Sequence, residues 1–413
     1  MRFLHVSDLH FGKSIHGVSL LENGDQGSWV ERFLNLCDEV SPDAVLIAGD
    51  VYDRGAPSGD AVQLLSRMLT ALAERRIPVL LTAGNHDSVQ RLSFAAPLLA
   101  EQGVYISESL SASPVLRHVT LKDEAGPVTF WLMPYVFPAL IGSVLGEDCP
   151  RDNDGAVRTL LASQPVDFSQ RNVLIAHQNV TANGVEGIRG GSESMVGGVG
   201  QIDYSAFDGF DYVALGHIHA AYPVGRDTVR YAGSPLCYHF DELRQPVKGP
   251  LLVELGEKGE APRIETRQIV PLHPMRELRG EYDALRNQLL NDSGRGEYVR
   301  VVLTDCRVSQ EISAFFRELL ESRESTLMEI VSEYNRYHDA EAPERDAVEQ
   351  KSMPELFTDF FVERLGGEMP TAGEEELIDY AASLVHHGEG GVLPNPKEIE
   401  RLLTFALGQE DTV

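Results

Sequence analysis

Five short segments of the chain combine aspartate, asparagine and histidine with glycine. They contain Asp8-Leu9-His10, the stretch from Gly49-Asp50 to Asp53, Gly84-Asn85-His86-Asp87, a single His177, and Gly216-His217-Ile218-His219. Carboxylate and amide oxygens and imidazole nitrogens are ligands for Mn²⁺, Fe²⁺, Zn²⁺ and Mg²⁺. One such segment alone is more typical of a capped turn or a surface histidine pair. Five in series predict a metal centre.

Each segment follows a short apolar run of the kind that forms a strand buried on both faces. These runs are Phe3–Val6, Ala44–Ala48, Val79–Thr82, Val173–Ala176 and Tyr212–Leu215. Helical patterns near Trp29–Val40 and Ala61–Glu74 separate the first three runs, and this alternation predicts a layered α/β fold. Because ligands of such sheets gather at the carboxyl ends of the strands, the five polar segments are expected to meet there.

The order D-x-H, G-D-x-x-D, G-N-H-[DE], H and G-H-x-H resembles that of the calcineurin-like metallophosphoesterases over residues 1–255. The resemblance implies a sandwich of two central β-sheets flanked by helices. It also implies two divalent metal ions, with Mn²⁺ favoured and Fe²⁺, Mg²⁺ and Zn²⁺ as alternatives. The implied ligands are Asp8, His10 and His219 for one ion and Asn85, His177 and His217 for the other, with Asp50 bridging the two.

The same resemblance implies catalytic roles beside the ligands. His86 is expected to stabilise the transition state or protonate the leaving oxygen, and Asp87 to orient its imidazole. Asp53 is a further candidate catalytic residue, although it stands where archaeal and eukaryotic nucleases of this type usually carry a second histidine. Arg54 is expected either to bind phosphate or to form a structural ion pair.

Longer segments narrow the resemblance to the SbcD nuclease-subunit family: MRFLHVSDLHFGK, AGDVYDRGAPS, AGNHDS, DYVALGHIH and YAGSPLCYHFDE. The narrower resemblance implies a DNA exonuclease and endonuclease that forms a homodimer and works with an SbcC-type coiled-coil ATPase. Ser192, in a Gly/Ser-rich loop, and His239 are candidate substrate-binding residues. Two alternatives stay open, namely a phosphomonoesterase or nucleotidase, and a non-catalytic scaffold of the same fold.

Four regions are predicted along the chain: a metallophosphoesterase domain over 1–262, a small α/β cap over 263–338, a polar linker over 339–352 and a C-terminal helical region over 353–413. Seven arginines lie between 263 and 300, at the position where the resemblance implies a DNA-facing cap. The alternative is that they pair with nearby acids such as Glu277, Glu281 and Asp283. A strand at Tyr298–Leu303, a helix around Phe316 and a strand near Leu327–Val331 are expected there. The resemblance implies that the C-terminal helices bind the ATPase; the alternative is that they form a small bundle of their own.

The 413 residues carry 35 basic and 63 acidic side chains, for a net charge of −28. Such a charge ordinarily argues against a nucleic-acid partner. Residues from 301 onward, which include the region expected to bind protein, hold 25 acids against 9 bases and so carry more than half of the excess. Four scattered cysteines exclude a disulfide framework. No membrane-spanning run and no GxxxxGKS nucleotide loop occur, so we expect a soluble, cytoplasmic, nucleoid-associated protein whose ATP dependence comes from its partner.

Overall fold

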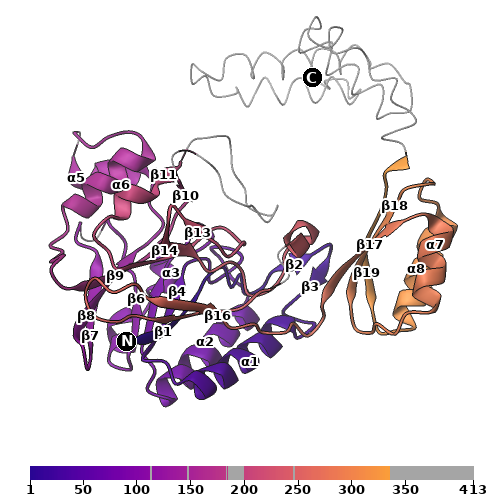
Figure 1. Cartoon of the computed structure of the whole chain (residues 1–413), viewed down its shortest axis with the longest axis horizontal. Coiled ribbons are helices and arrows are strands. Elements are labelled where there is room, and N and C mark those ends of the chain that lie inside the picture. The colour runs from indigo at the N-terminus through magenta and orange to yellow at the C-terminus, as the bar shows by residue number, and fades with distance from the viewer. Residues whose placement is uncertain (112–113, 147, 183, 185–199, 245–246, 335–413) are drawn as a thin grey trace, which may run out of the picture. The chain divides into compact units, whose positions relative to one another are not determined.

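The computed structural model describes residues 1–334 apart from 112–113, 147, 183, 185–199 and 245–246 (Figure 1). The chain divides into two compact units, Met1–Ser332 and Glu333–Val413. The candidate residue Ser192, the predicted linker and the predicted C-terminal helices all lie outside the described residues. The first unit holds both the predicted nuclease domain and nearly all of the predicted cap.

Two six-stranded sheets form the centre of this unit (Figure 1). The first has the order β16-β15-β1-β4-β5-β6, with bounds Arg263–Thr266, Leu251–Glu254, Arg2–Val6, Ala44–Ala48, Val79–Thr82 and Val104–Ile106. The second has the order β13-β14-β12-β9-β8-β7, with bounds Pro223–Val224, Arg226–Tyr231, Tyr212–Gly216, Arg171–His177, Gly126–Met133 and Arg117–Asp123. Because β16 pairs with β15, the first sheet continues past the domain boundary predicted at residue 262.

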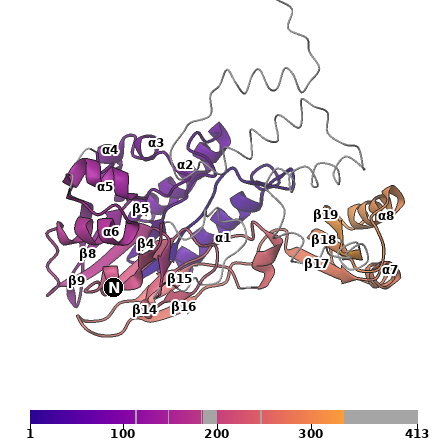
Figure 2. The ribbon, with the colours of Figure 1, turned by 90° about the horizontal axis from the view of Figure 1, so that it is seen from above.

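Three apolar layers hold the sheets and helices together. Phe3, Leu46, Phe130, Val173 and Tyr212 belong to the layer between the two sheets, where all five are fully buried. The outer face of the first sheet is covered by α1 (Asp25–Val40) and α2 (Gly59–Glu74), which Figure 2 shows beside it. The second sheet is covered by α5 (Pro138–Leu145) and α6 (Asn153–Ala162). The predicted sandwich of two sheets flanked by helices is confirmed.

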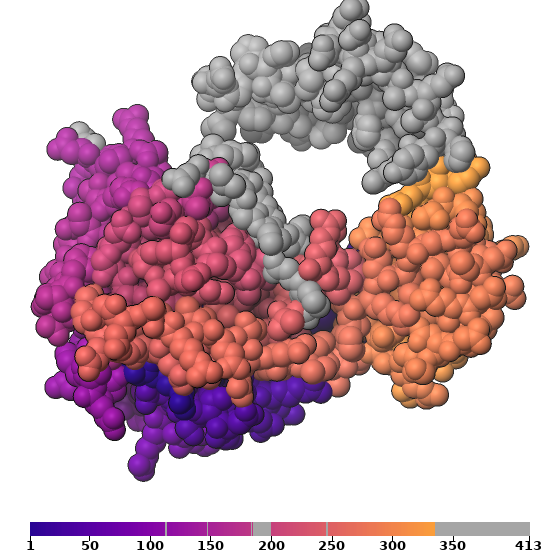
Figure 3. All heavy atoms as spheres, viewed as in Figure 1, coloured from indigo at the N-terminus to yellow at the C-terminus, as the bar shows by residue number. Residues whose placement is uncertain are grey.

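A smaller β/α layer follows in the chain. Its strands β17 (Met275–Gly280), β18 (Tyr298–Leu303) and β19 (Thr326–Ser332) form a parallel sheet that α7 (Tyr282–Leu290) and α8 (Gln310–Glu321) cover. The expected strands and the expected helix of this region are all present. Phe240, in the short helix η2 (Phe240–Arg244), lies with its ring 5.8 Å from the Arg300 guanidinium of β18. Figure 3 shows the orange surface of this β/α layer.

The parallel strands bring the polar segments to one edge. β1, β4 and β5 run parallel in the first sheet, and β9 and β12 run parallel in the second. Their carboxyl ends therefore lie together, as the sequence predicts. Across the described ranges, no helix combines the length and the apolar character that crossing a membrane requires.

Candidate metal centre

The loops after the five strands carry most of the predicted ligands into the interior. Asp8, His10, Asp50, His177 and His219 are all buried. Asn85 is exposed and His217 is half-buried, so these two side chains form the open side of the cluster. Since isolated charges and imidazoles are costly to bury, such a concentration needs a compensating partner.

The backbone in these loops is held in an uncommon conformation. Asp8, His10, Asp50 and His217 all have positive φ angles, between 43° and 105°, although none is glycine. Such left-handed geometry costs of order 1–3 kcal/mol for each residue and clusters at functional sites. Glycine is needed at Gly216, where a Cβ atom would overlap the Ala48 carbonyl oxygen. The loops are thus built to bring side chains from two sheets close together.

One group of atoms lies around His10 and His219. The Nε2 atoms of these two imidazoles face each other 3.3 Å apart, and an Asp8 carboxylate oxygen lies within 4.8 Å of a nitrogen from each. Asp8 also accepts the backbone N–H of His217, at 3.1 Å, which fixes its carboxylate. These three residues could hold one cation.

A second group lies around Asn85. Its Oδ1 atom is 3.0 Å from His177 Nε2 and 3.1 Å from His217 Nδ1. The Asp50 Oδ2 atom lies between the two groups, 3.3 Å from His177 Nε2 and 3.6 Å from His10 Nε2. The structure therefore brings together all seven predicted ligands, with Asp50 at the place of a bridging group.

The hydrogen bonds around the imidazoles fit cation binding. His219 donates its Nδ1–H to the Glu242 carboxylate. Its Nε2 atom therefore carries a lone pair, and this lone pair faces His10. Burial lowers the pKa of His217 to about 3 and lowers that of His10, so both rings are neutral and able to act as ligands. Lone pairs and carboxylates that converge in this way repel one another unless a cation lies among them. The residues present therefore fit divalent metal ions.

His86 lies next to this cluster, but its contacts differ from those predicted. Its backbone N–H donates to Asp50 Oδ1 at 2.9 Å, and its Nδ1 atom lies 2.9 Å from the carbonyl oxygen of Asp53. The prediction that Asp87 orients the imidazole is wrong. The Asp87 carboxylate instead accepts the backbone N–H groups of Val51, Tyr52 and Gly84, and so it joins the second and third loops.

Asp53 and Arg54 stand at the rim of the cluster. The Asp53 carboxylate accepts a hydrogen bond from the Lys13 ammonium at 2.9 Å and lies 3.6 Å from His10 Nδ1. Arg54 is largely exposed, with its Nε 3.8 Å from Asp53. A phosphate-binding role for Arg54 and a catalytic role for the Asp53 side chain stay predictions. His239, a candidate substrate contact, accepts the backbone N–H of Asp241 in its own turn, and its role also stays a prediction.

Sequence reasoning missed several buried polar residues around the centre. Tyr238 donates its hydroxyl to the Leu9 carbonyl at 2.8 Å, and Gln26 donates to the His10 carbonyl at 2.8 Å, so both fix the first loop. Glu242 contacts His219 directly. None of them belongs to a recognisable spacing pattern, and Gln26 and Glu242 lie in polar stretches of the chain, so the sequence carries no signal that singles them out.

Two cap arginines are paired with acids rather than exposed to solvent. Arg276 forms ion pairs with Asp292 and Glu297, and Arg300 lies 3.0 Å from Glu329. Both residues form ion pairs, but of the acids named in the alternative only Glu277 takes part, 3.7 Å from Arg300.

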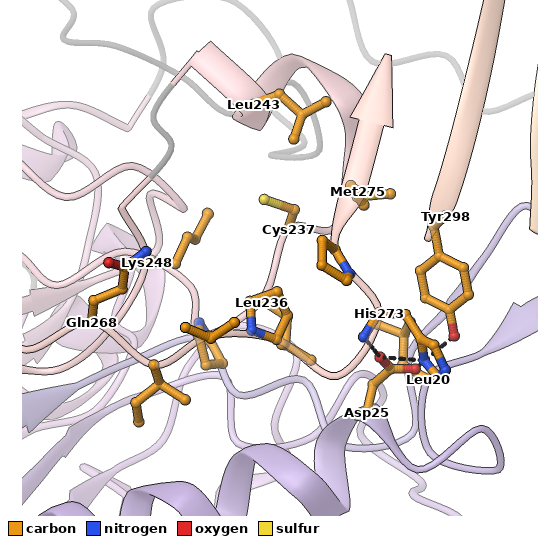
Figure 4. Close-up of a pocket in the computed structure, with 15 residues that line it drawn as sticks. Leu20, Asp25, Leu236, Cys237, Leu243, Lys248, Gln268, His273, Met275 and Tyr298 are labelled. Atoms are coloured by element: carbon orange, nitrogen blue, oxygen red, sulfur yellow. Dashed lines mark hydrogen bonds and ion pairs between the residues drawn. The ribbon is translucent and has the colours of Figure 1, made fainter. Parts of the chain in front are cut away.

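A cavity of about 310 Å³ is lined in part by Lys248, which also contacts His219 (Figure 4). Its walls are mostly apolar and include Leu236, Leu243 and Met275. At one end Asp25 accepts hydrogen bonds from Tyr298, at 2.6 Å, and from His273, as the dashed lines show. None of the predicted metal ligands lines this cavity, so it is distinct from the candidate centre.

Known proteins resemble the chain over both of its characteristic parts. Residues 1–221 match the calcineurin-like phosphoesterase family, and residues 271–364 match the family described as the type 5 capsule protein repressor C-terminal domain. A Staphylococcus saprophyticus protein named as the SbcD subunit of the nuclease SbcCD is 33% identical over 298 residues, which are 70% of this chain and 74% of that protein. The convergent loops, the two-sheet sandwich and these similarities lead to one conclusion: the chain belongs to the calcineurin-like phosphoesterases, within the SbcD nuclease-subunit family.

Proposed function

We propose that this protein is a metal-dependent DNA nuclease that hydrolyses phosphodiester bonds by a two-metal mechanism. The proposal depends above all on the Asp50 carboxylate, which lies within 3.6 Å of imidazole nitrogens from both ligand groups. Two divalent ions, when bound there, supply an activated water and stabilise charge on the phosphate oxygens. Manganese is the ion that we propose for both sites.

His86 is proposed to act on the leaving oxygen. Because the Asp53 carbonyl accepts the Nδ1–H, the ring is fixed and Nε2 is the nitrogen left for the substrate. The ring lies 4.8 Å from that of His10, centroid to centroid, so a phosphate bound at the cluster comes within its reach. When protonated, Nε2 donates its proton to the departing sugar oxygen.

We further propose an SbcC-type ATPase and a second copy of this chain as protein partners, both acting with it on cytoplasmic DNA. The ATPase is inferred from the name of the Staphylococcus relative, and we assign its contact to the helices predicted after residue 353. The homodimer is supported by an apolar surface on α3 (Val89–Leu92) and α4 (Ala96–Ala100), where Phe94 is 81% and Leu98 68% exposed beside a groove against α2. Exposed apolar patches of this kind mark interaction sites.

The proposal is tested by incubating the full chain with end-labelled duplex and hairpin DNA in Mn²⁺, with and without the ATPase. Wild type is expected to cleave, a chelator to stop it, and His86→Ala to lose at least about 100-fold in rate, as expected for loss of a general acid. His118→Ala, which changes an exposed histidine of β7, is the matched control. Undiminished cleavage by His86→Ala contradicts the mechanism. Turnover of p-nitrophenyl phosphate without any DNA cleavage favours the phosphomonoesterase alternative.

A further inference from the structure

Glu242 is a buried carboxylate outside the predicted ligand set. It lies in η2 and is 3% exposed. Its Oε1 atom accepts the Nδ1–H of His219 at 3.1 Å, and its Oε2 atom lies 2.5 Å from Lys248 Nζ. The Ser234 hydroxyl donates to the same Oε2 at 3.2 Å. A charged group this far from solvent needs such partners to remain ionised.

Lys248 contacts the same histidine from another direction. Its ammonium donates to the His219 carbonyl oxygen at 2.9 Å and to the Ser234 hydroxyl at 2.6 Å, in addition to Glu242. The side chain is 11% exposed, and Figure 4 shows it at the edge of the apolar cavity, close to Gln268. The two charges therefore hold both the ring and the backbone of His219.

We propose that Glu242 and Lys248 form a positioning pair for the first metal site, which fixes the ring orientation and the tautomer of His219. The inference depends on the metal centre of the proposed function and adds two residues to it. A carboxylate that accepts the Nδ1–H leaves the Nε2 lone pair for the cation and makes the imidazole a stronger ligand. Lys248 keeps that carboxylate ionised and in place.

The charge state of Glu242 agrees with this role. Its Oε2 atom lies 2.5 Å from the Lys248 ammonium and accepts the Ser234 hydroxyl, and these contacts stabilise the ionised form of the carboxylate. The anion can take only hydrogen bonds that are donated to it, so the proton between the two residues is fixed on His219 Nδ1.

The second ligand group is supported differently. There the Nδ1 of His177 donates to the uncharged Ala48 carbonyl, at 2.8 Å. An uncharged acceptor polarises an imidazole less than a carboxylate does. Loss of the Glu242 charge is thus expected to weaken the binding of the ion held by His219 and to leave the binding of the other ion unchanged.

The test is Mn²⁺ titration of the full chain by isothermal calorimetry, with the paramagnetic resonance spectrum of the bound ions as a second readout. Wild type is expected to bind two ions. Glu242→Gln is expected to bind one with wild-type affinity and the other about 10- to 100-fold more weakly, the range seen for outer-shell partners of metal ligands. Glu254→Gln, which changes a surface carboxylate paired with Arg2, is the matched control and should behave as wild type.

A double variant keeps the proposal testable if Glu242→Gln folds poorly with Lys248 left unpaired. Glu242→Gln combined with Lys248→Met removes both charges, and it should show the same selective loss of one ion. If either folded variant binds both ions with wild-type affinity, the positioning role is refuted, even where its metal-free stability is lower. If wild type itself binds no Mn²⁺, the proposed metal centre has failed instead, so the two failures are distinguishable.

Discussion

Replacing Lys248 with methionine leaves the Glu242 carboxylate buried without its cation. Breaking a buried ion pair on one side costs about 3–5 kcal/mol. The lowered pKa of Glu242 agrees with this direction, because the Lys248 ammonium stabilises the ionised carboxylate against the effect of burial. We therefore expect Lys248→Met to lower the free energy of unfolding by about 3 kcal/mol, which corresponds to about 4 °C in melting temperature for a unit of this size.

The assay is urea and thermal unfolding of the full chain in the presence of a chelator. Lys258→Met is the matched control, since this lysine lies 2.9 Å from Asp211 but is 34% exposed. The Lys258→Met substitution should lower the free energy of unfolding by about 1 kcal/mol or less. If Lys248→Met costs no more than Lys258→Met, the buried pair does not have the strength inferred here.

The pH dependence gives a second check on the same residue. A carboxyl group whose folded pKa is lowered contributes its full stability above the unfolded value of 4.5 and loses that contribution as the pH falls toward 2. Without Lys248, burial raises the pKa, so the variant gains relative stability on acidification. The loss of unfolding free energy in Lys248→Met, relative to wild type, should thus be larger at pH 7 than at pH 4. An equal loss at both pH values would contradict the pairing.

Three further predictions concern the metal centre, the dimer and the cap. Mn²⁺ at 100 times its dissociation constant should stabilise wild type by about 2.7 kcal/mol for each ion. In a thermal-shift assay, Asp50→Asn should lose most of this gain. A gain equal to that of wild type would rule out Asp50 as the bridging residue. Phe94→Glu should convert a dimer to a monomer in light scattering, whereas a persistent dimer would place the interface elsewhere. Arg276→Ala should leave the salt dependence of DNA binding unchanged, because its charge is held by Asp292 and Glu297; a slope reduced by about 1 would reveal a phosphate contact.

Much of the fold could be predicted because the strands are short, apolar and buried on both faces. The run Ala44–Ala48 coincides with β4, and every residue in it is buried. The ligands follow such strands directly, so the rule that parallel strands end at one edge brings the ligands of each sheet together. Asp50 and His177 belong to different sheets, and only the family resemblance assigned them to one site.

Contacts that depend on the course of a loop or on strand register could not be predicted. Asp87 follows His86 in the sequence, yet its carboxylate faces backbone N–H groups, whereas the imidazole faces the Asp53 carbonyl. Adjacency along a tight turn does not determine which way two side chains point.

The cap arginines show the same limit. Arg300 lies opposite Glu277 on one neighbouring strand and opposite Glu329 on the other, a register that only the assembled sheet defines. Glu242 was missed for a related reason, because its burial depends on Lys248, which follows η2 with no periodic pattern between them.

The central claim is that two cations share the Asp50 carboxylate at the ends of five strands. Anomalous diffraction at the manganese edge, from crystals of the full chain grown with Mn²⁺, tests it most directly. We predict two peaks about 3.5–4 Å apart, one between His10 and His219 and the other between Asn85 and His177, with Asp50 contacting both. A single peak, or peaks away from these residues, would contradict it.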